Sequence, residues 1–370
     1  MGRLDEIQPY LSNRLDPAVE AYKWIAGIIG DRPSQYAKSP LLWNKVFTTL
    51  GLDAVFLSFD VEASNLSSVV EILRRSERVV GFSVTVPYKI DIIGFLDDLD
   101  SKARQVGAVN TVVRTKDEKL VGYNTDGQGF IDMLTKSLPN QESPFFEDLE
   151  GRHALLIGAG GAARAVAFFL AEAIGNHGCL TVANRDPNKA RELAADVAKA
   201  YSNATHVTEI DIGTVAVAAD LIINATTKGQ GGVRKLAGRQ ITCLEPYCAL
   251  APAGPAEFPE DLISCESEFY AAWYKHSCQD IEANLSLADK ILTAIPKETA
   301  FVDLIYAPLE TRLLAMARLS GHRVLNGRGM NISQAADAFV NRVMRPYLAA
   351  LGWDPEGAYR RVFEIMDQVW

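Results

Sequence analysis

Lys89 and Asp126 are two ionisable residues that stand among small polar side chains, in the stretches GFSVTVPYK and GYNTDGQG. A lysine ammonium can donate a proton to an oxygen that gains charge during a reaction, and a carboxylate can hold that lysine in place. Hydroxyl and amide side chains lie in similar loops at or after predicted strands: Ser39, Thr85, Asn110 and Thr125. Because ligands of α/β proteins bind where strand ends converge, these residues predict a surface for a polyhydroxy ligand.

The stretch that ends at Lys89 begins as a strand. Apolar and small polar residues alternate over 82–86, which is the pattern of a half-buried strand, and Pro87 ends it. A lone lysine after a strand is usually a solvated side chain. The alternative is that the strand ends here so that Lys89 faces a ligand together with Thr85.

A glycine-rich turn lies between an apolar strand and a long apolar helix, at IGAGGAAR (157–164). This is the context of a dinucleotide fingerprint, in which glycines let the backbone approach the pyrophosphate and the helix N–H groups bind it. Close packing of a helix on a strand is the alternative explanation of such residues. The predicted nucleotide contacts in this turn are Gly158, Ala159, Gly160, Gly161 and Ala162.

The end of the next strand indicates which nucleotide binds. An acidic residue there would bind the ribose 2′-OH of NAD, but Asn184 occupies the place. Arg185 offers a planar fork for the 2′-phosphate of NADP, and Lys189 lies a turn further on. NADP is therefore favoured over NAD. Asp186 is an argument for NAD, since its carboxylate could bind the ribose. Alternatively, it simply caps the following helix.

The elements that position these residues form two α/β units. The first reads as strand, helix, strand, helix, strand, then a strand pair and a helix, at 24–30, 41–51, 54–61, 64–76, 81–87, 108–125 and 127–138. A Ser or Asn cap is predicted for the helix at 64–76. After a polar linker at 138–151, a second β-α-β-α-β series begins at His153. Such alternation predicts mostly parallel sheets covered by helices.

The composition excludes several classes of protein. The chain has 370 residues, 48% of them hydrophobic, which is enough for two domains with large cores. A net charge of -9 argues against a nucleic-acid partner. Neither a membrane-spanning run nor a secretory signal is visible, and five cysteines in a long chain are typical of a reducing compartment. We therefore expect a cytoplasmic protein without a nucleic-acid or membrane partner.

Short motifs follow one another in a specific order over most of residues 24–340: SVTVPYK, GAVNT, GYNTDG, GAGGAARA, NATTKG, DLIYAPLETRLL and GRGMNISQAADAF. In this order they resemble the shikimate and quinate dehydrogenase family. The resemblance implies an α/β substrate-binding domain at 1–126 and 328–370. It also implies an NADP-binding Rossmann domain at 127–327, carrying an insertion at about 229–300, with the active site in the cleft between the domains.

The resemblance also implies roles for individual residues. Lys89 matches the catalytic lysine and Asp126 its partner. Reduction of a ring ketone places negative charge on its oxygen as hydride arrives, so an ammonium proton donor fits that reaction. The implied substrate-binding residues are Ser39, Thr85, Asn110, Tyr306 and Gln334. Thr226 and Gly329 join the implied cofactor-binding residues.

Two of the motifs depart from the family pattern. The first loop usually reads His-Ser-x-Ser-Pro, and both serines hold the substrate carboxylate, but here Ala37 replaces the first serine. We expect Tyr36 or Ser34 to compensate, or the acid group to be held differently. Loss of one neutral hydroxyl contact should cost about 1 kcal/mol of binding free energy. Ser83 and Tyr88 replace the usual Asn and His of the lysine motif, which bears on the substrate.

The connection from Asn224 to Asp303 is longer than is usual in the family. It holds four of the five cysteines and His276, which raises a zinc site as an alternative. The spacings are irregular and no CxxC pair occurs, so packing as small hydrophobes is favoured and no metal is predicted. An amphipathic helix at 280–295 is expected to cover the cofactor domain or to contact a second subunit. Two more amphipathic helices, broken at 352–355, are expected to pack on the first domain.

The interpretation that follows is an NADP-dependent dehydrogenase that interconverts 3-dehydroshikimate and shikimate, in aromatic amino acid biosynthesis, as a monomer or homodimer. A quinate or aminoshikimate dehydrogenase, including one that uses NAD, is the alternative within the family. A non-catalytic sensor of quinate-type ligands is the alternative of another class. Retention of Lys89 and Asp126 beside a complete glycine turn argues against the sensor, because binding alone needs no proton donor.

Overall fold

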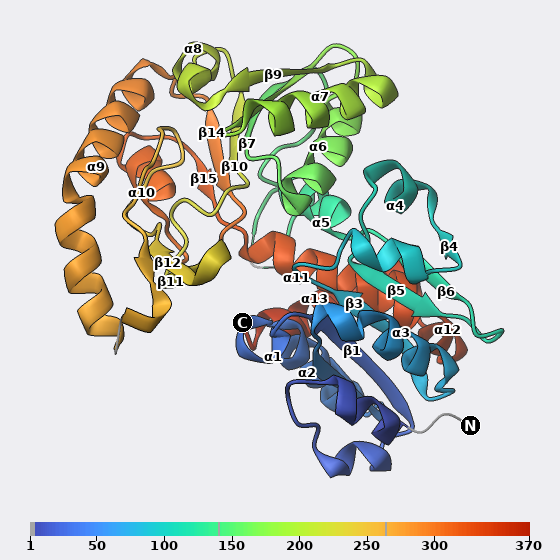
Figure 1. Cartoon of the computed structure of the whole chain (residues 1–370). Helices are drawn as coiled ribbons and strands as arrows, with labels where there is room; N and C mark the ends of the chain where they lie inside the picture. Colours follow the sequence, from blue (N-terminus) through green and yellow to red (C-terminus); the bar gives the residue numbers. More distant parts are fainter. Residues whose placement is uncertain (1–3, 140, 263–264) are drawn as a thin grey trace. The chain divides into compact units, whose positions relative to one another are not determined.

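The computed structural model describes residues 4–139, 141–262 and 265–370, and the chain divides into two compact α/β units (Figure 1). The first unit runs to Phe146 and resumes at Gly329, and the second spans Glu147–Arg328. The predicted boundary at 126/127 lies about 20 residues earlier. The difference arises because helix α5 (Asp126–Thr135) packs on helix α11 (Arg328–Asp337) in the first unit.

A mixed six-stranded sheet forms the centre of the first unit, with the strand order β2-β1-β3-β5-β6-β4. Its strands are β1 (Trp24–Gly30), β2 (Ala54–Asp60), β3 (Val79–Val84), β4 (Asp98–Leu99), β5 (Thr111–Arg114) and β6 (Leu120–Tyr123). The β2-β1-β3 part is parallel, as the alternation predicts. The predicted strand pair is the antiparallel β5–β6 hairpin, whose strand β5 also pairs antiparallel with β3.

Helices pack on both faces of this sheet. They are α1 (Pro33–Tyr36), α2 (Ser39–Leu50), α3 (Leu66–Arg75), α4 (Ser101–Val106), α5, α11, the π-helix Ala338–Val343, α12 (Arg345–Ala350) and α13 (Pro355–Asp367). Short 3₁₀ turns lie at Leu4–Tyr10, Pro17–Ala21, Ala63–Asn65 and Asp91–Phe95. As predicted, the C-terminal helices belong to this unit.

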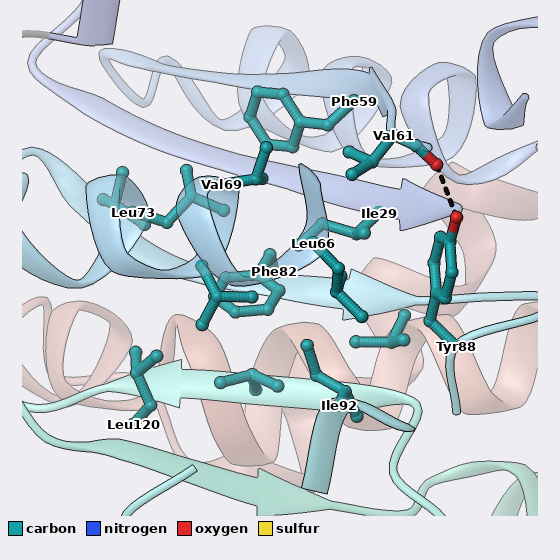
Figure 2. Packing of buried hydrophobic residues seen from close by; sticks show 14 of the residues in the cluster. Ile29, Phe59, Val61, Leu66, Val69, Leu73, Phe82, Tyr88, Ile92 and Leu120 are labelled. Carbon is teal, nitrogen blue, oxygen red and sulfur yellow. Dashed lines mark hydrogen bonds between the residues drawn. The ribbon is translucent and has the colours of Figure 1, made fainter. Parts of the chain in front are cut away.

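The helix α3 buries an apolar stripe in the core cluster that contains Phe59 and Phe82 (Figure 2). The stripe has the spacing of an amphipathic helix and consists of Leu66, Val69, Val70 and Leu73. The predicted side-chain cap is wrong. Asn65 makes no cap hydrogen bond, because it ends the 3₁₀ turn before α3 and already has helical dihedral angles (φ -100°, ψ -7°) instead of the extended ones of a cap residue. Its amide donates to the carbonyl of Tyr10 at 3.3 Å.

Strand β3 ends two residues earlier than the alternation predicts. Val86 is 66% exposed, although its carbonyl still accepts the N–H of Asp31 at 3.2 Å. The chain is then fixed by Tyr88, which is buried and donates its hydroxyl to the carbonyl of Val61 at 2.6 Å (Figure 2). Burial and the nearby acidic residues raise the pKa of Tyr88, so this anchor next to Lys89 stays a hydrogen-bond donor.

An all-parallel six-stranded sheet forms the second unit, in the order β15-β14-β10-β7-β8-β9. The strands are β7 (His153–Ile157), β8 (Cys179–Asn184), β9 (Ala204–Thr208), β10 (Leu221–Asn224), β14 (Ala300–Asp303) and β15 (Val324–Leu325). The helices include α6 (Gly161–Ile174), α7 (Pro187–Tyr201), α8 (Ile212–Ala216) and α10 (Arg312–Leu319). Counted along the chain, the order is 3-2-1-4-5-6, which is that of the dinucleotide-binding Rossmann fold.

The insertion between β10 and β14 is only partly helical. Helix α9 (Glu266–Ala294) is longer than predicted, and a three-stranded antiparallel sheet precedes it. Its strands β11 (Val233–Lys235), β12 (Gln240–Cys243) and β13 (Phe258–Pro259) are too short to show an alternating pattern, which is why the sequence did not indicate them. Two further 3₁₀ turns lie at Ala237–Arg239 and Glu260–Leu262, and one at Glu209–Asp211 follows β9.

The cysteines of the insertion differ in exposure. Cys243 and Cys248 are buried in apolar clusters, as predicted, but Cys278 is half-buried and Cys265, directly before α9, is exposed. Over the described ranges, no group of three or more His, Cys, Asp or Glu side chains is arranged to hold a metal ion. Within the same ranges, no helix combines the length and the apolar character needed to cross a membrane.

Candidate active site

Lys89 and Asp126 form an ion pair in the first unit. The Lys89 ammonium donates to Oδ2 of Asp126 at 2.6 Å, and the two side chains are 20% and 11% exposed. Asp126 is the first residue of α5, where the helix dipole stabilises a carboxylate. Partial shielding from solvent strengthens such a pair relative to one on the surface. The structure therefore holds the lysine at a fixed position and leaves part of it accessible.

A tight turn before α5 sets the position of Asp126. Asn124 accepts the backbone N–H of Asp126 at 3.2 Å, and its own amide donates to the carbonyl of Ala108 at 3.0 Å. Asn124 is 5% exposed. The sequence analysis missed this positioning residue, although an Asn shortly before a predicted helix is a known signal for such a turn.

Asn110 lies directly before strand β5 and connects that strand to the ion pair. Its amide donates to Oδ1 of Asp126 at 2.8 Å and to the hydroxyl of Thr125 at 2.9 Å. Its carbonyl oxygen accepts the N–H of Thr125 at 2.8 Å. Asp126 thus uses one carboxylate oxygen for Lys89 and the other for Asn110, which fixes the orientation of the carboxylate.

Gln334 reaches the same cluster from the C-terminal segment. Its side-chain oxygen lies 3.3 Å from the amide nitrogen of Asn110, which is 224 positions away in the sequence. Helices α5 and α11 can approach this closely because Gly129 has no side chain. A Cβ at Gly129 would lie 2.7 Å from the backbone nitrogen of Gln334. The structure therefore brings together Lys89, Asp126, Asn110 and Gln334, as the motifs predicted.

The remaining predicted substrate contacts of the first unit lie near the end of β1. An atom built as Cβ on Gly30 would be 2.5 Å from the methyl group of Thr85 and 3.1 Å from the hydroxyl of Tyr36. Tyr36 is therefore close to Thr85. Ser34 cannot supply a free hydroxyl in place of the missing serine, because its hydroxyl donates to Asp60. The Ser39 hydroxyl has no hydrogen-bond partner in the described part of the chain.

The glycine turn after β7 has two kinds of glycine. Gly158 has a φ of +121°, and a Cβ there would lie 2.8 Å from the carbonyl oxygen of Ala225, so the fold itself requires glycine. A Cβ at Gly160 or Gly161 would meet no atom of the described chain within 4 Å. Packing within the chain therefore does not explain these two glycines at the N-terminus of α6. Close approach of a ligand such as a pyrophosphate would explain them.

Thr226 lies beside this turn, and its methyl group would be 3.2 Å from a Cβ at Gly158. Its hydroxyl donates to the side-chain oxygen of Asn224 at 2.7 Å, which fixes the loop after β10. Ala159 is half-buried and Ala162 is exposed. The predicted nucleotide contacts of the turn and of this loop are thus neighbours in the second unit.

The end of β8 carries unpaired positive charge. Asp186 caps α7 by accepting the N–H of Asn188 at 3.0 Å, so the capping interpretation of Asp186 is correct. Asn184 donates to the backbone carbonyl of Asp186 at 3.1 Å. Arg185 and Lys189 are exposed, and no carboxylate within the described ranges pairs with either. The positive charges of Arg185 and Lys189 are therefore available to an anion at this strand end.

Arg234 of β11 is a candidate that the sequence analysis missed. Burial and the positive charge of Arg185 lower the pKa of Arg234, so the two guanidinium groups lie within electrostatic range. Among the described residues, no carboxylate pairs with Arg234. Glu209 follows directly after β9, whose last residue pairs with the last residue of β8. Its carboxylate does not neutralise the two guanidinium groups, because it is already paired with the buried Lys228. Phosphate groups suit such an uncompensated pair of guanidinium groups.

Two predicted residues lie in a different unit from the other residues predicted to bind the same ligand. Tyr306 lies in the second unit, whereas the other predicted substrate contacts lie in the first, and burial raises its pKa. Gly329 lies in the first unit, whereas the other predicted nucleotide contacts lie in the second. A Cβ at Gly329 would lie 2.8 Å from Met133, so close packing of α11 on α5 accounts for this glycine.

Comparisons with known proteins agree with this arrangement. The model of the shikimate dehydrogenase substrate binding domain matches residues 28–112, and the model of shikimate / quinate 5-dehydrogenase matches residues 141–237. A curated relative, shikimate dehydrogenase (NADP(+)) of Moorella thermoacetica, is 35% identical over 327 residues, which are 87% of this chain and 88% of the relative.

Solved structures give the same result. A shikimate dehydrogenase in complex with NADP+ is 28% identical, with a TM-score of 0.64 over 94% of this chain and 96% of the other. A quinate dehydrogenase from Corynebacterium glutamicum in complex with NAD is 25% identical, with a TM-score of 0.64 over 92% and 98% of the two chains. The protein is an NAD(P)-dependent oxidoreductase. Within that class, the chain belongs to the shikimate/quinate 5-dehydrogenase family.

Proposed function

We propose that this protein is an NADP-dependent shikimate dehydrogenase, which reduces 3-dehydroshikimate to shikimate and catalyses the reverse oxidation. The observation that carries the proposal is the partly shielded ion pair of Lys89 and Asp126, fixed by Asn110. It is supported by the curated relative of the same activity, which is 35% identical over most of both chains.

In the proposed mechanism, Lys89 donates a proton to the ketone oxygen as negative charge develops there. A bound NADPH supplies the hydride to the carbonyl carbon. Asp126 keeps the ammonium in place and accepts a hydrogen bond from a substrate hydroxyl. Because Lys89 is 20% exposed, water can return a proton to its neutral amine after each reduction. Oxidation uses the same residue as the proton acceptor.

The proposed substrate contacts are hydroxyl and amide groups that match a ring bearing several hydroxyls. They are Ser39, Thr85, Asn110 and Gln334 of the first unit, with Tyr306 of the second. Ser39 is the remaining serine for the carboxylate, and its free hydroxyl supports this role. Tyr36 is the proposed replacement for the hydroxyl lost at Ala37, because its own hydroxyl lies close to Thr85.

The proposed nucleotide contacts are the turn of Gly158, Ala159, Gly160, Gly161 and Ala162 for the pyrophosphate, with Asn184 at the ribose. Thr226 and Gly329 are proposed near the nicotinamide. The unpaired Arg185 and Lys189 support binding of the 2′-phosphate of NADP, and Arg234 adds a further cation. A carboxylate, which would favour NAD, is not free at this strand end, since Asp186 caps α7.

A quinate or aminoshikimate dehydrogenase is the second candidate. It is favoured by the replacement of a carboxylate-binding serine with Ala37 and by Tyr88, whose hydroxyl is bound to Val61 and cannot contact a ligand as a free imidazole would. The solved quinate dehydrogenase with NAD shows that this family includes both a second substrate and a second nucleotide.

The test is a panel of shikimate, quinate and aminoshikimate, each with NADP and with NAD, in which formation of reduced nicotinamide is followed by its absorbance. The proposal expects kcat/KM to be highest for shikimate with NADP, by at least about tenfold over each other pair. A higher value for quinate or aminoshikimate would replace shikimate as the substrate. A higher value with NAD would reject the proposed role of Arg185 and Lys189.

A further inference from the structure

The second unit contains a cavity of about 400 Å³ between the start of α9, the segment after β12 and the start of α10. Figure 1 shows the start of α9, drawn in orange, beside the short strands β11 and β12. The cavity has the size of a small-molecule site. None of the residues that line it belongs to the proposed substrate or nucleotide contacts. The insertion supplies most of its wall.

Three aromatic side chains of α9 line the cavity: Tyr270, Trp273 and Tyr274. Trp273 is fixed from behind, because it donates its indole N–H to Thr242 at 3.2 Å and stacks on Phe269 with ring centroids 6.3 Å apart. Trp273 itself is buried, whereas Tyr270 is half-buried and Tyr274 is 60% exposed. The rings that a flat ligand can reach are therefore those of the two tyrosines, and Trp273 supports them from behind.

The cavity also contains one carboxylate and one guanidinium group, from Glu245 and Arg312. No ion pair joins them, and neither makes a hydrogen bond or ion pair with its side chain to any described residue. Tyr270 lies near Glu245: burial raises the pKa of Tyr270 to about 12, and the nearby Cys243, Glu266 and Glu245 add to the effect. Two opposite charges are therefore available on the walls of one aromatic cavity.

We propose that this cavity binds a free α-amino acid with an aromatic side chain. The ligand carboxylate pairs with Arg312, whose planar fork suits a carboxylate, and the ligand ammonium pairs with Glu245. The aromatic side chain packs against Tyr270 and Tyr274, and the ammonium is also attracted to the tyrosine ring faces. A ligand with only one charge leaves one wall residue unpaired, so both charges are needed for tight binding.

The test is titration calorimetry on the full chain without nucleotide. L-tryptophan, L-tyrosine and L-phenylalanine are the ligands, and tryptamine and indole-3-propionate are the analogues that lack the carboxylate or the ammonium. We expect at least one amino acid to bind about tenfold more tightly than either analogue, which corresponds to about 1.4 kcal/mol. Absence of binding by all three amino acids at millimolar concentration would overturn the proposal, and so would an affinity for each of the three that is no higher than the affinity for the analogues.

Two variants separate the two charges. Both residues are exposed, so their substitution leaves the fold intact. Arg312→Met should weaken binding of the amino acid and of indole-3-propionate about tenfold, and leave tryptamine unchanged. Glu245→Gln should weaken the amino acid and tryptamine, and leave indole-3-propionate unchanged. Arg318→Met on the same helix α10 and Glu257→Gln in the same insertion are the controls, and an equal loss of affinity in them would overturn the assignment.

Discussion

Lys89 and Asp126 meet at 2.6 Å in the first unit, although 37 positions separate them in the sequence. The lysine follows β3, and the carboxylate begins α5. Asn110 holds the second oxygen of the carboxylate at 2.8 Å. Because every partner of Asp126 is on a buried or half-buried segment, the pair is set by the fold and needs no ligand to form.

Removal of the carboxylate charge should slow the reaction without unfolding the protein. Asp126→Asn keeps the size of the side chain but loses the charge that attracts the Lys89 ammonium, so we expect kcat for shikimate oxidation to fall by about 10²-fold. Steady-state kinetics measures this, with Asp117→Asn on the surface of the same unit as the control. An unchanged kcat would show that Asp126 does not position the lysine.

The glycine turn offers a pair of substitutions that separates folding from nucleotide binding. Gly160→Ala places a methyl group where no described atom lies within 4 Å, so we expect unchanged thermal stability and a nucleotide affinity at least about tenfold lower. Gly158→Ala meets Ala225 and has a φ of +121°, so we expect it to lower the free energy of unfolding itself by roughly 1–3 kcal/mol. Thermal melts and a nucleotide titration of both variants measure these effects. Full nucleotide affinity in Gly160→Ala would contradict the proposed pyrophosphate site.

The two neighbouring guanidinium groups should select NADP. Arg185→Gln and Arg234→Gln each remove a cation from the proposed 2′-phosphate site, so we expect the Kd for NADPH to rise about tenfold in each. The Kd for NADH should stay within about twofold, since NADH has no 2′-phosphate. Fluorescence titration of both nucleotides measures this, and Arg191→Gln on helix α7 serves as the control. Equal losses for NADPH and NADH would reject the assignment.

Asp303 should make stability fall as pH rises through the acidic range. Burial raises its pKa from 3.8 to about 6 in spite of hydrogen bonds from Asn224 and Thr311. Between those values the folded chain binds the proton that the unfolded chain has lost, so this residue stabilises the fold at low pH and the stabilisation is lost by pH 6. At about 1.4 kcal/mol for each pKa unit, the loss is roughly 3 kcal/mol.

Urea unfolding of the parent and of Asp303→Asn at a series of pH values measures this effect. The asparagine cannot ionise, so the free-energy difference between the two proteins should shift in favour of the variant as pH rises from 4 to 6. A constant difference over that range would show that Asp303 titrates in the folded protein as it does in the unfolded chain.

The sequence predicted those parts of the fold that local patterns determine. The two α/β series, the glycine turn and the residues of the ion pair follow from alternation and motifs that lie within a few residues of one another. The order of strands in the second unit agrees with the dinucleotide-binding fold that the turn at Gly158 predicts. Strand ends were less predictable: β3 ends at Val84, although alternation continues to Val86 and the carbonyl of Val86 still accepts the N–H of Asp31 at 3.2 Å.

Other parts depend on contacts between distant segments. The sequence did not indicate that Arg234 lies near Arg185, because β11 is short and its place depends on pairing with β12. The predicted boundary at 126/127 differs from the division of the structure into two compact units, because nothing local shows that α5 packs on α11 through Gly129. Asn124 was missed although its signal was local, since its neighbour Asp126 was interpreted only as a charged partner of the lysine.

The central claim is that Lys89 transfers the proton, and single-turnover reduction of 3-dehydroshikimate by NADPH tests it most directly. Lys89→Met keeps the apolar part of the side chain and removes the ammonium, so we expect the rate of NADPH oxidation to fall by about 10³-fold while NADPH binding stays within about twofold. Lys45→Met on the exposed face of α2 is the control and should keep the parent rate. A Lys89→Met protein that oxidises NADPH at the parent rate would contradict the account.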